Sequence, residues 1–335
     1  MMDNLSLLVQ VPVLNIQLLL DGIFVGSIFA LAAYGLALVW GVMNVKNLAQ
    51  GDFVIMGGYI AWWLSIDVNI WIGMPAFNFD FLWISALHIS TTAIPFLEFM
   101  KPAIHPIFGL PVAVVVMFGF GWFIYITIIS RVIGKDMFTS LLATFGLALV
   151  ISQLLNLAFG PEVQVAESGF EVNSFFDGMV TVANIRFISL ILAGLLAAMV
   201  ITFMKFSRMG QAIRATAQDP RAAKVMGIDT ERIYAFTFAL NAAICGAAGA
   251  LISMIWVIQP FFGIAHSIRS FVIVTAAGLG NLPGVIIAGL GLGVAELYSG
   301  FVFGAELQQF TVVGLLVAIL VWRQIQQSRH RQPVQ

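Results

Sequence analysis

Charge is what this sequence has least of. Only 9% of its 335 residues are Asp, Glu, Lys or Arg, whereas 61% are hydrophobic. A soluble domain has about 25% charged residues and roughly 45–50% apolar ones. So little charge cannot cover a surface that faces water, and the sequence therefore predicts a protein whose solvent is lipid. The formal net charge of −1 also excludes a broad basic face, so we expect no nucleic-acid partner.

Residues that carry catalytic or metal chemistry are also scarce. The only cysteine, Cys245 in the run AAICGAAGA, excludes a disulfide framework and indicates a small packing residue. The four histidines, His88, His105, His266 and His330, show no metal-ligand spacing. The phosphate-binding pattern GxxxxGK[ST] is absent, and no Ser/His/Asp set can be placed at one membrane depth. We therefore expect no enzyme, cofactor or metal site in this chain.

Long apolar runs make up most of the sequence. A membrane-spanning helix needs about 20 mostly apolar residues. The run 79–100 contains acidic residues, His88 and Pro95, which favours an external insertion at 67–109 with an interfacial helix or hairpin over an extra membrane element. The N-terminal MMDNLSLLVQ has no basic residue ahead of its apolar part, so we expect no cleaved signal peptide. Candidate spans are residues 17–42, 53–66, 111–129, 138–159, 187–206, 233–257 and 306–321.

Lysine and arginine indicate the orientation, because loops rich in them stay in the cytoplasm. The basic segment 208–232 and the turn with Arg131 and Lys135 are expected inside. The loop 160–186 is acidic, with no Lys or Arg before Arg186, and is expected outside. Lys46 in the first turn leaves the N-terminus outside. The C-terminal tail is expected in the cytoplasm because it carries Arg323, Arg329 and Arg331.

One further apolar run, 267–299, is too long for a single span and must enter and leave by the same face. The sequence GLGNLPG at 278–284 predicts a break, which gives either a re-entrant hairpin or two tilted helices of about 15 residues each. The expected fold is an all-α polytopic membrane protein, a single domain over 1–335 with about 8–9 membrane elements. Small residues at four-residue spacing, as at Gly22, Gly26 and Ala30, predict close helix packing, with glycines lining a permeation path as the alternative.

Two similar runs indicate a weak internal repeat: NLAQGDFVIMGGYIA at 47–61 and NLPGVIIAGLGLGVA at 281–295. Each starts with Asn-Leu, passes a helix-breaking step and continues as an apolar segment with glycines. Paired interrupted segments in two halves of a chain point to a transport site. Chance resemblance is the alternative. The candidate pathway residues are Asn47, Gln50, Gly51, Asp52, Gly280, Asn281 and Gly284.

Acidic residues near the spans are further candidates, because burying a charge in a membrane is costly. They are Asp21, Asp52, Glu296 and Glu306. Asp21 and Glu306 are near span ends, where a side chain reaches water more easily. Asp52 is the strongest candidate for a pathway residue, and its alternative role is the N-cap of the second helix.

The segment RMGQAIRATAQDPRAAKVMGID at 208–229 concentrates charge between two apolar spans. Its pattern predicts two short helices joined by a sharp bend, with Asp219 as N-cap, Pro220 in the first turn and Gly227 as the C-terminal stop. Ala222 and Ala223 are predicted to form a small face that a partner protein can approach. The alternative is an interfacial helix whose basic residues bind anionic lipid headgroups.

Three runs of the sequence resemble the bacterial branched-chain amino acid ABC transporter permeases. They are GSIFALAAYGLALVWGVMNVKNLAQGDFVIMGGYIA, GQAIRATAQDPRAAKVMGIDTERIYAFTFALNAAICGAAGAL and GLGNLPGVIIAGLGLGVAE. The resemblance covers most of the chain apart from roughly 67–109 and 160–186. It implies a multi-pass subunit of the bacterial inner membrane, with a second homologous permease, two ATP-binding subunits and an external binding protein as partners.

The same resemblance makes 208–232 the cytoplasmic coupling loop, where the ATP-binding subunits dock. The candidate coupling residues are Arg214, Asp219, Pro220, Ala222, Ala223 and Gly227. The implied function is ATP-driven uptake of branched-chain or similar neutral amino acids. Gln50 stands where many members have a histidine, and the insertion around 77–106 is longer than the family pattern. Urea and short-amide permeases share the three motifs, so they stay an alternative, as does an ion-coupled carrier or channel.

Overall fold

The computed structural model describes residues 6–8, 10–66, 105–167, 169–175, 180–278 and 280–330. Most of the expected insertion at 67–109 lies outside the described residues, and so does Asp177 of the acidic loop. Within the described ranges, seven helices are long and apolar enough to cross a membrane. The protein is therefore an all-α polytopic membrane protein, as the composition predicts.

The helices follow the predicted spans closely. In chain order they are α2 (Pro12–Met43), α3 (Gln50–Ser65), α6 (Pro106–Thr127), α7 (Met137–Phe159), α8 (Asn184–Phe206), α9 (Arg208–Gln218), α10 (Pro220–Val225), α11 (Thr230–Ile255), α12 (Gly263–Ala277), α13 (Leu282–Phe303) and α14 (Gln308–His330). Short 3₁₀ turns lie at Ile129–Arg131, Pro260–Phe262 and Ala305–Leu307. One hairpin, β1 (Val172–Phe175) and β2 (Val180–Ala183), was not predicted from the sequence.

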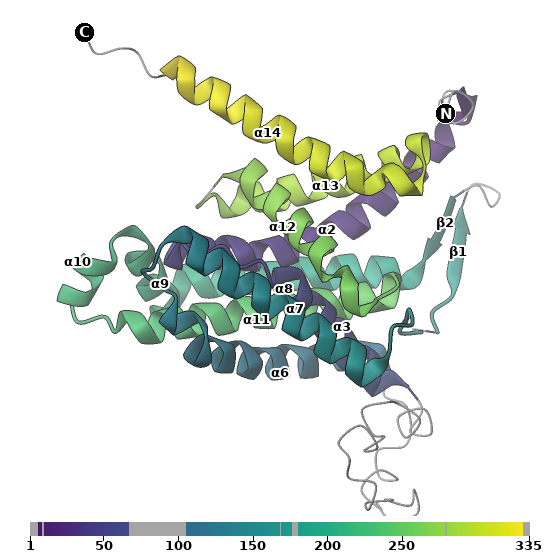
Figure 1. Cartoon of the computed structure of the whole chain (residues 1–335). Coiled ribbons are helices and arrows are strands. Elements are labelled where there is room, and N and C mark those ends of the chain that lie inside the picture. The colour runs from purple at the N-terminus through teal and green to yellow at the C-terminus, as the bar shows by residue number, and fades with distance from the viewer. Residues whose placement is uncertain are drawn as a thin grey trace, which may run out of the picture.

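The molecule has two distinct ends (Figure 1). The short helix α10 lies at one, which we call the α10 end, and the β1–β2 hairpin lies at the other, the hairpin end. At the hairpin end, Thr181 of β2 exchanges hydrogen bonds with the side chain of Gln17 on α2. Gln164 and Ile258 form a bridge between the loops after α7 and α11. These contacts fix the hairpin-end loops to the helices.

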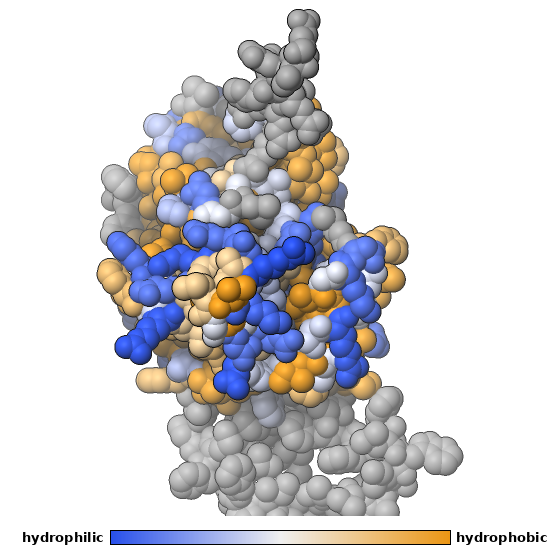
Figure 2. Space-filling view, turned by 90° about the vertical axis from the view of Figure 1, so that its left-hand side faces the viewer, coloured by the Kyte–Doolittle hydropathy of each residue, from blue (hydrophilic) through white to orange (hydrophobic). Residues whose placement is uncertain are grey.

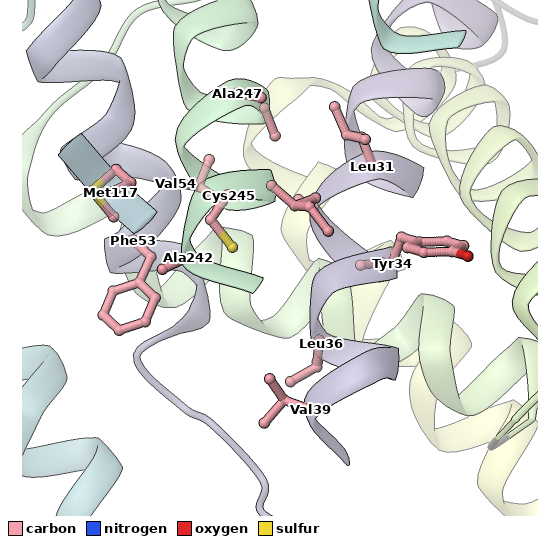
Figure 3. Packing of buried hydrophobic residues seen from close by; sticks show 14 of the residues in the cluster. Leu31, Tyr34, Leu36, Val39, Phe53, Val54, Met117, Ala242, Cys245 and Ala247 are labelled. Atoms are coloured by element: carbon pink, nitrogen blue, oxygen red, sulfur yellow. The ribbon is translucent and has the colours of Figure 1, made fainter. Parts of the chain in front are cut away.

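The core is built around α2 and α11, in each of which 89% of the most apolar 18-residue stretch is buried. Helix α11 packs against α2, α3 and α6. Figure 3 shows Ala242, Cys245 and Ala247 of α11 between the side chains of α3 and those of α2, among them Val54 and Leu31. Cys245 is fully buried in this packing, as predicted, and its Sγ also accepts a hydrogen bond from Nε2 of Gln50 at 2.9 Å.

Glycines allow α2 and α13 to pack closely, as the small-residue spacing predicts. A Cβ atom on Gly26 would lie 2.8 Å from the carbonyl oxygen of Gly289, and one on Gly293 would lie 2.4 Å from that of Gly22. By contrast, a Cβ on Gly41 or Gly280 would meet no atom within 4 Å. These two glycines therefore make no such contact within the described residues.

The break predicted at 278–284 is present. Helix α12 ends at Ala277, and α13 begins at Leu282 after Gly278 and Gly280, both with positive φ. The turn faces the α10 end, because Gly280 and Leu282 line a groove there with residues of α2 and α9. The far end of α13 lies at the hairpin end, where Tyr298 donates to the carbonyl oxygen of Asn15. Thus α12 and α13 enter and leave by one end, although α13, with 22 residues, is longer than predicted.

Candidate functional site

The step between α2 and α3 carries four of the predicted pathway residues into the middle of the bundle. Asn44, with φ 53°, ends α2, and the chain then runs without a helix to α3. At the start of α3, the amide of Gln50 donates to the carbonyl oxygen of Ala32 at 2.8 Å. Ala32 lies 11 residues before the end of α2 at Met43 (43 − 32), which is about 16 Å along an α-helix. Helix α3 therefore begins deep inside the bundle.

A buried polar cluster surrounds this helix start. The side chains of Gln50 and Asn241 bond to each other at 3.0 and 3.1 Å. The backbone N–H of Gly51 donates to Ser267 of α12 at 2.8 Å, and the Ser267 hydroxyl donates to the carbonyl oxygen of Leu48. A Cβ on Gly51 would lie 1.8 Å from the carbonyl oxygen of Gly263. These contacts hold α3 against α11 and α12.

Asp52 is fully buried, but it is not the N-cap of α3. The N-cap is Ala49, which makes no side-chain capping bond, while Asn47 accepts from the backbone N–H of Ala49 at 3.1 Å. Asp52 instead accepts from the hydroxyl of Ser152 on α7 at 2.6 Å. Its second oxygen, Oδ2, has no hydrogen-bond partner in the described part of the chain. The capping alternative for Asp52 is therefore wrong.

The other three predicted pathway residues lie elsewhere. Asn281 caps α13, because its side chain accepts from the backbone N–H of Gly284 at 3.1 Å. Gly280 and Asn281 are exposed, and Gly280 lines the groove at the α10 end, whose volume is about 530 Å³. Asn47 and Asn281 thus occupy similar places before their helices, one buried and one exposed. No hydrogen bond among the described residues joins the predicted pathway residues at 47–52 to those at 280–284.

The two short helices predicted after α8 are present as α9 and α10. Asp219 accepts from the backbone N–H groups of Arg221 and Ala222 at 2.8 and 3.1 Å, which confirms its capping role. Pro220 is the first residue of α10. Gly227 has φ +84°, and its N–H donates to the carbonyl oxygen of Lys224, which confirms the predicted stop.

The exposed face of α10 differs from the predicted alanine face. Ala223 is only 5% exposed, so it packs inside this chain and cannot meet a partner. Val225 and Met226 are 87% and 81% exposed, and Ala222 is exposed beside them. Figure 2 faces the α10 end and shows a small hydrophobic area among hydrophilic side chains. Val225 and Met226 are therefore the most exposed apolar side chains of α10 and the turn that follows it.

Arg214 also has an internal role. Its guanidinium donates to the backbone carbonyl oxygens of Met204 and Lys205 at the end of α8. Arginine at such a position satisfies the last carbonyl groups of a helix. Arg214 therefore holds α9 against α8.

Glu296, one of the acidic candidates, forms a buried ion pair with Arg269, a partner that the sequence analysis missed. Arg269 of α12 donates from Nε to both carboxylate oxygens of Glu296 on α13, each at 3.0 Å. The two side chains are 10% and 1% exposed. The guanidinium carbon lies 5.0 Å from the ring centre of Phe29 and 5.6 Å from that of Trp256. The signal was present in the sequence: a single Arg in the run 267–299, followed in the same run by Glu296.

A cavity of about 360 Å³ lies beside this ion pair, and we call it the Arg269 cavity. It sits where α11 ends and where α12 and α14 begin, and Glu306 contributes to its wall. Its lining residues are Trp256, Val257, Phe262, Ala265, His266, Arg269, Glu306, Gln308 and Gln309. The cavity combines a buried cation, a carboxylate, amides and apolar surface.

Comparison with known proteins identifies the class. Residues 18–320 match the family model described as branched-chain amino acid transport system / permease component. The chain therefore belongs to this family of membrane transport permeases.

The chain is similar along most of its length to curated members of that family. It is 26% identical over 311 residues to the high-affinity branched-chain amino acid transport system permease protein LivH of Salmonella typhimurium, covering 91% of this chain and 92% of LivH. It is 26% identical to BraD, the permease protein of the corresponding system of Pseudomonas aeruginosa, covering 92% and 94%. A shorter match, 31% identical over 164 residues, covers 47% of this chain and 38% of the permease protein LivM of Escherichia coli. No solved structure gives a significant match.

Proposed function

We propose that the chain is the membrane-spanning permease subunit of an ATP-driven importer of branched-chain or similar neutral amino acids. The observation that carries the proposal is the family match over residues 18–320, together with relatives named as branched-chain amino acid permeases. Aliphatic substrates suit a pathway made mostly of apolar side chains. ATP binding and hydrolysis belong, in this proposal, to separate subunits.

The proposed orientation places the α10 end in the cytoplasm and the hairpin end outside. It is supported by the basic residues of α9 and α10, because positively charged loops stay inside. The N-terminus is then external, the C-terminus is cytoplasmic, and the acidic loop 160–186 faces outward. For a bacterial chain this membrane is the inner membrane.

The proposed partners are two ATP-binding subunits, a second homologous permease, an external substrate-binding protein and membrane lipid. The similarity to LivM supports a second, related permease, because LivH and LivM are both named as permease proteins of such a system in Escherichia coli. We place the ATP-binding subunit against Val225 and Met226 of α10, with Arg221 and Lys224 flanking the contact. Motion of α9 and α10 would then reach the bundle through Arg214 and α8.

Reconstitution tests this function. The complex encoded with this chain is incorporated into proteoliposomes, and uptake of labelled leucine and of urea is measured with and without ATP and the cognate binding protein. We expect leucine uptake that requires both. Urea uptake without leucine uptake would favour the urea or amide permease, and ATP-independent uptake by the chain alone would favour a carrier or channel.

A further inference from the structure

The Arg269 cavity lies beside an ion pair that is buried inside the helix bundle. Burying an arginine inside a membrane bundle is costly, and such residues usually mark a functional site. Glu296 satisfies one edge of the guanidinium, through Nε and Nη2. Nη1 has no hydrogen-bond partner in the part of the chain that the structure describes, and Arg269 lines the cavity. The planar guanidinium therefore keeps donors for a second carboxylate.

The other charged group of the cavity is Glu306. It is exposed, and it forms no ion pair among the residues described. Because Arg269 and Glu296 neutralise each other, Glu306 is left as the uncompensated charge of the cavity. An ammonium group is the natural complement to this carboxylate, and the amides of Gln308 and Gln309 lie on the same wall.

The rest of the wall is apolar and suits an aliphatic side chain. Trp256, Val257, Phe262 and Ala265 line it, and the volume of about 360 Å³ falls in the range of small-molecule sites, roughly 300–1,000 Å³. Phe262 and Glu306 lie beside the starts of α12 and α14, at the end of the molecule that carries the hairpin. In the proposed orientation this is the side on which substrate arrives.

We propose that the Arg269 cavity binds the zwitterion of an aliphatic α-amino acid, with Arg269 on its carboxylate and Glu306 on its ammonium group. Glu296 holds Arg269 in place through the other edge of the guanidinium, at Nε and Nη2. The proposal rests on the proposed function and deepens it, because it assigns a binding site within the permease. It also distinguishes amino acids from urea, which has neither a carboxylate nor an ammonium group.

Direct binding to the intact importer complex, without the binding protein, tests the assignment. The probes are leucine, leucinol, which lacks the carboxylate, and 4-methylpentanoate, which lacks the ammonium group. The wild type is expected to bind leucine about 10- to 100-fold more tightly than leucinol, the range for losing a hydrogen-bonded charge contact. No detectable leucine binding, or equal binding of leucine and leucinol, would overturn the proposal.

Two variants separate the charged contacts. Arg269→Lys keeps the charge opposite Glu296 but loses the second guanidinium edge, so leucine affinity is expected to fall about 10-fold or more and the preference over leucinol to disappear. Glu306→Gln is expected to weaken leucine about 2- to 5-fold, since this charge is exposed, and to leave 4-methylpentanoate binding unchanged. The matched control is Arg186→Lys, in the ion pair with Asp21 outside the cavity, which is expected to bind like the wild type.

Two further measurements distinguish a folding defect from a loss of binding, and a wrong site from a wrong function. If Arg269→Lys lowers the melting temperature, the double variant Arg269→Gln/Glu296→Gln replaces it, because removing both charges leaves neither buried alone. Retained preference for leucine over leucinol in the folded variant would overturn the site. If the wild type imports leucine while Arg269→Lys and Glu306→Gln bind like it, the cavity assignment fails and the proposed function stands. If the wild type imports no amino acid, the proposed function fails, and the cavity assignment with it.

Discussion

At the scale of single residues, backbone contacts rather than apolar side chains decide how closely the central helices approach. Gly249 of α11 is the clearest case, since a Cβ atom there would lie 1.8 Å from the carbonyl oxygen of Val54 on α3. Gly51 of α3 shows a similar approach to α12, because a Cβ atom there would lie 1.8 Å from the carbonyl oxygen of Gly263. A side chain at such a position cannot be accommodated by a rotamer change, because the neighbouring atom belongs to the backbone.

Gly249→Ala is therefore expected to destabilise the protein by about 1–3 kcal/mol or more, the cost of overpacking a core. The control is Gly119→Ala on α6, where a Cβ would meet no atom within 4 Å. Alanine there is expected to be neutral or slightly stabilising. Thermal melting of the purified protein in detergent compares the two. Equal melting temperatures for both variants would contradict the close α3–α11 contact.

Asp52 offers a second test at this scale, because its buried carboxylate has one oxygen without a partner. Asparagine has the same shape and can still accept from Ser152, while it avoids burying a charge. We expect Asp52→Asn to keep the melting temperature or raise it, and to keep leucine uptake. A stable Asp52→Asn variant without uptake would instead assign Asp52 to the transport pathway.

At the scale of elements, α10 shows which features of a helix can be predicted from its sequence and which cannot. Its two ends were predictable because Asp219, Pro220 and Gly227 act on the local backbone. Its exposed face was not, because the burial of Ala223 depends on which side of a six-residue helix meets the rest of the chain. The start of α3 deep in the bundle, and the pairing of Arg269 with Glu296, were missed for the same reason: both depend on contacts between distant segments.

Val225→Asp is expected to remove substrate-stimulated ATP hydrolysis by the complex, because it places a charged carboxylate in the proposed apolar contact. Val225 is too exposed for the change to alter the fold. The measurement is the ATPase rate with and without loaded binding protein. The control is Val172→Asp, at an exposed position on β1 at the opposite end, which is expected to keep the stimulation. Normal stimulation in Val225→Asp would exclude α10 as the docking element.

Ala222 and Ala223 are expected to respond differently, in contrast to the single alanine face predicted from the sequence. Ala223→Leu overpacks a buried position and is expected to lower the melting temperature, whereas Ala222→Leu is expected to leave it unchanged and to weaken coupling. Melting curves and ATPase rates of the two variants measure this difference.

At the scale of the whole molecule, composition alone was enough for the fold class. Charge placement predicts a complete orientation, which stays a prediction. The spans were predictable because a bilayer imposes a length and an apolar composition on each helix. The spans before and after the run 267–299 end and begin on the same side, so this run had to enter and leave by one face. Helices α12 and α13 do so in the structure. The β1–β2 hairpin was not predictable, because a four-residue strand is too short for its alternation, as in Val180, Thr181 and Val182, to identify it, and because β2 is held by contacts with α2.

The orientation can be measured with introduced cysteines. The natural Cys245 is buried and is expected to remain unlabelled, so it need not be replaced. In intact cells, a membrane-impermeant maleimide is expected to label Val172→Cys but not Val225→Cys, whereas both are labelled after the membrane is permeabilised. Labelling of Val225→Cys in intact cells would reverse the proposed orientation.

The most direct test of the account is uptake of labelled leucine into proteoliposomes that hold the complete importer with its binding protein. The account predicts leucine accumulation that requires ATP, and loss of that accumulation when the permease carries Val225→Asp. Accumulation that proceeds equally without ATP, or that is unchanged by Val225→Asp, would contradict it.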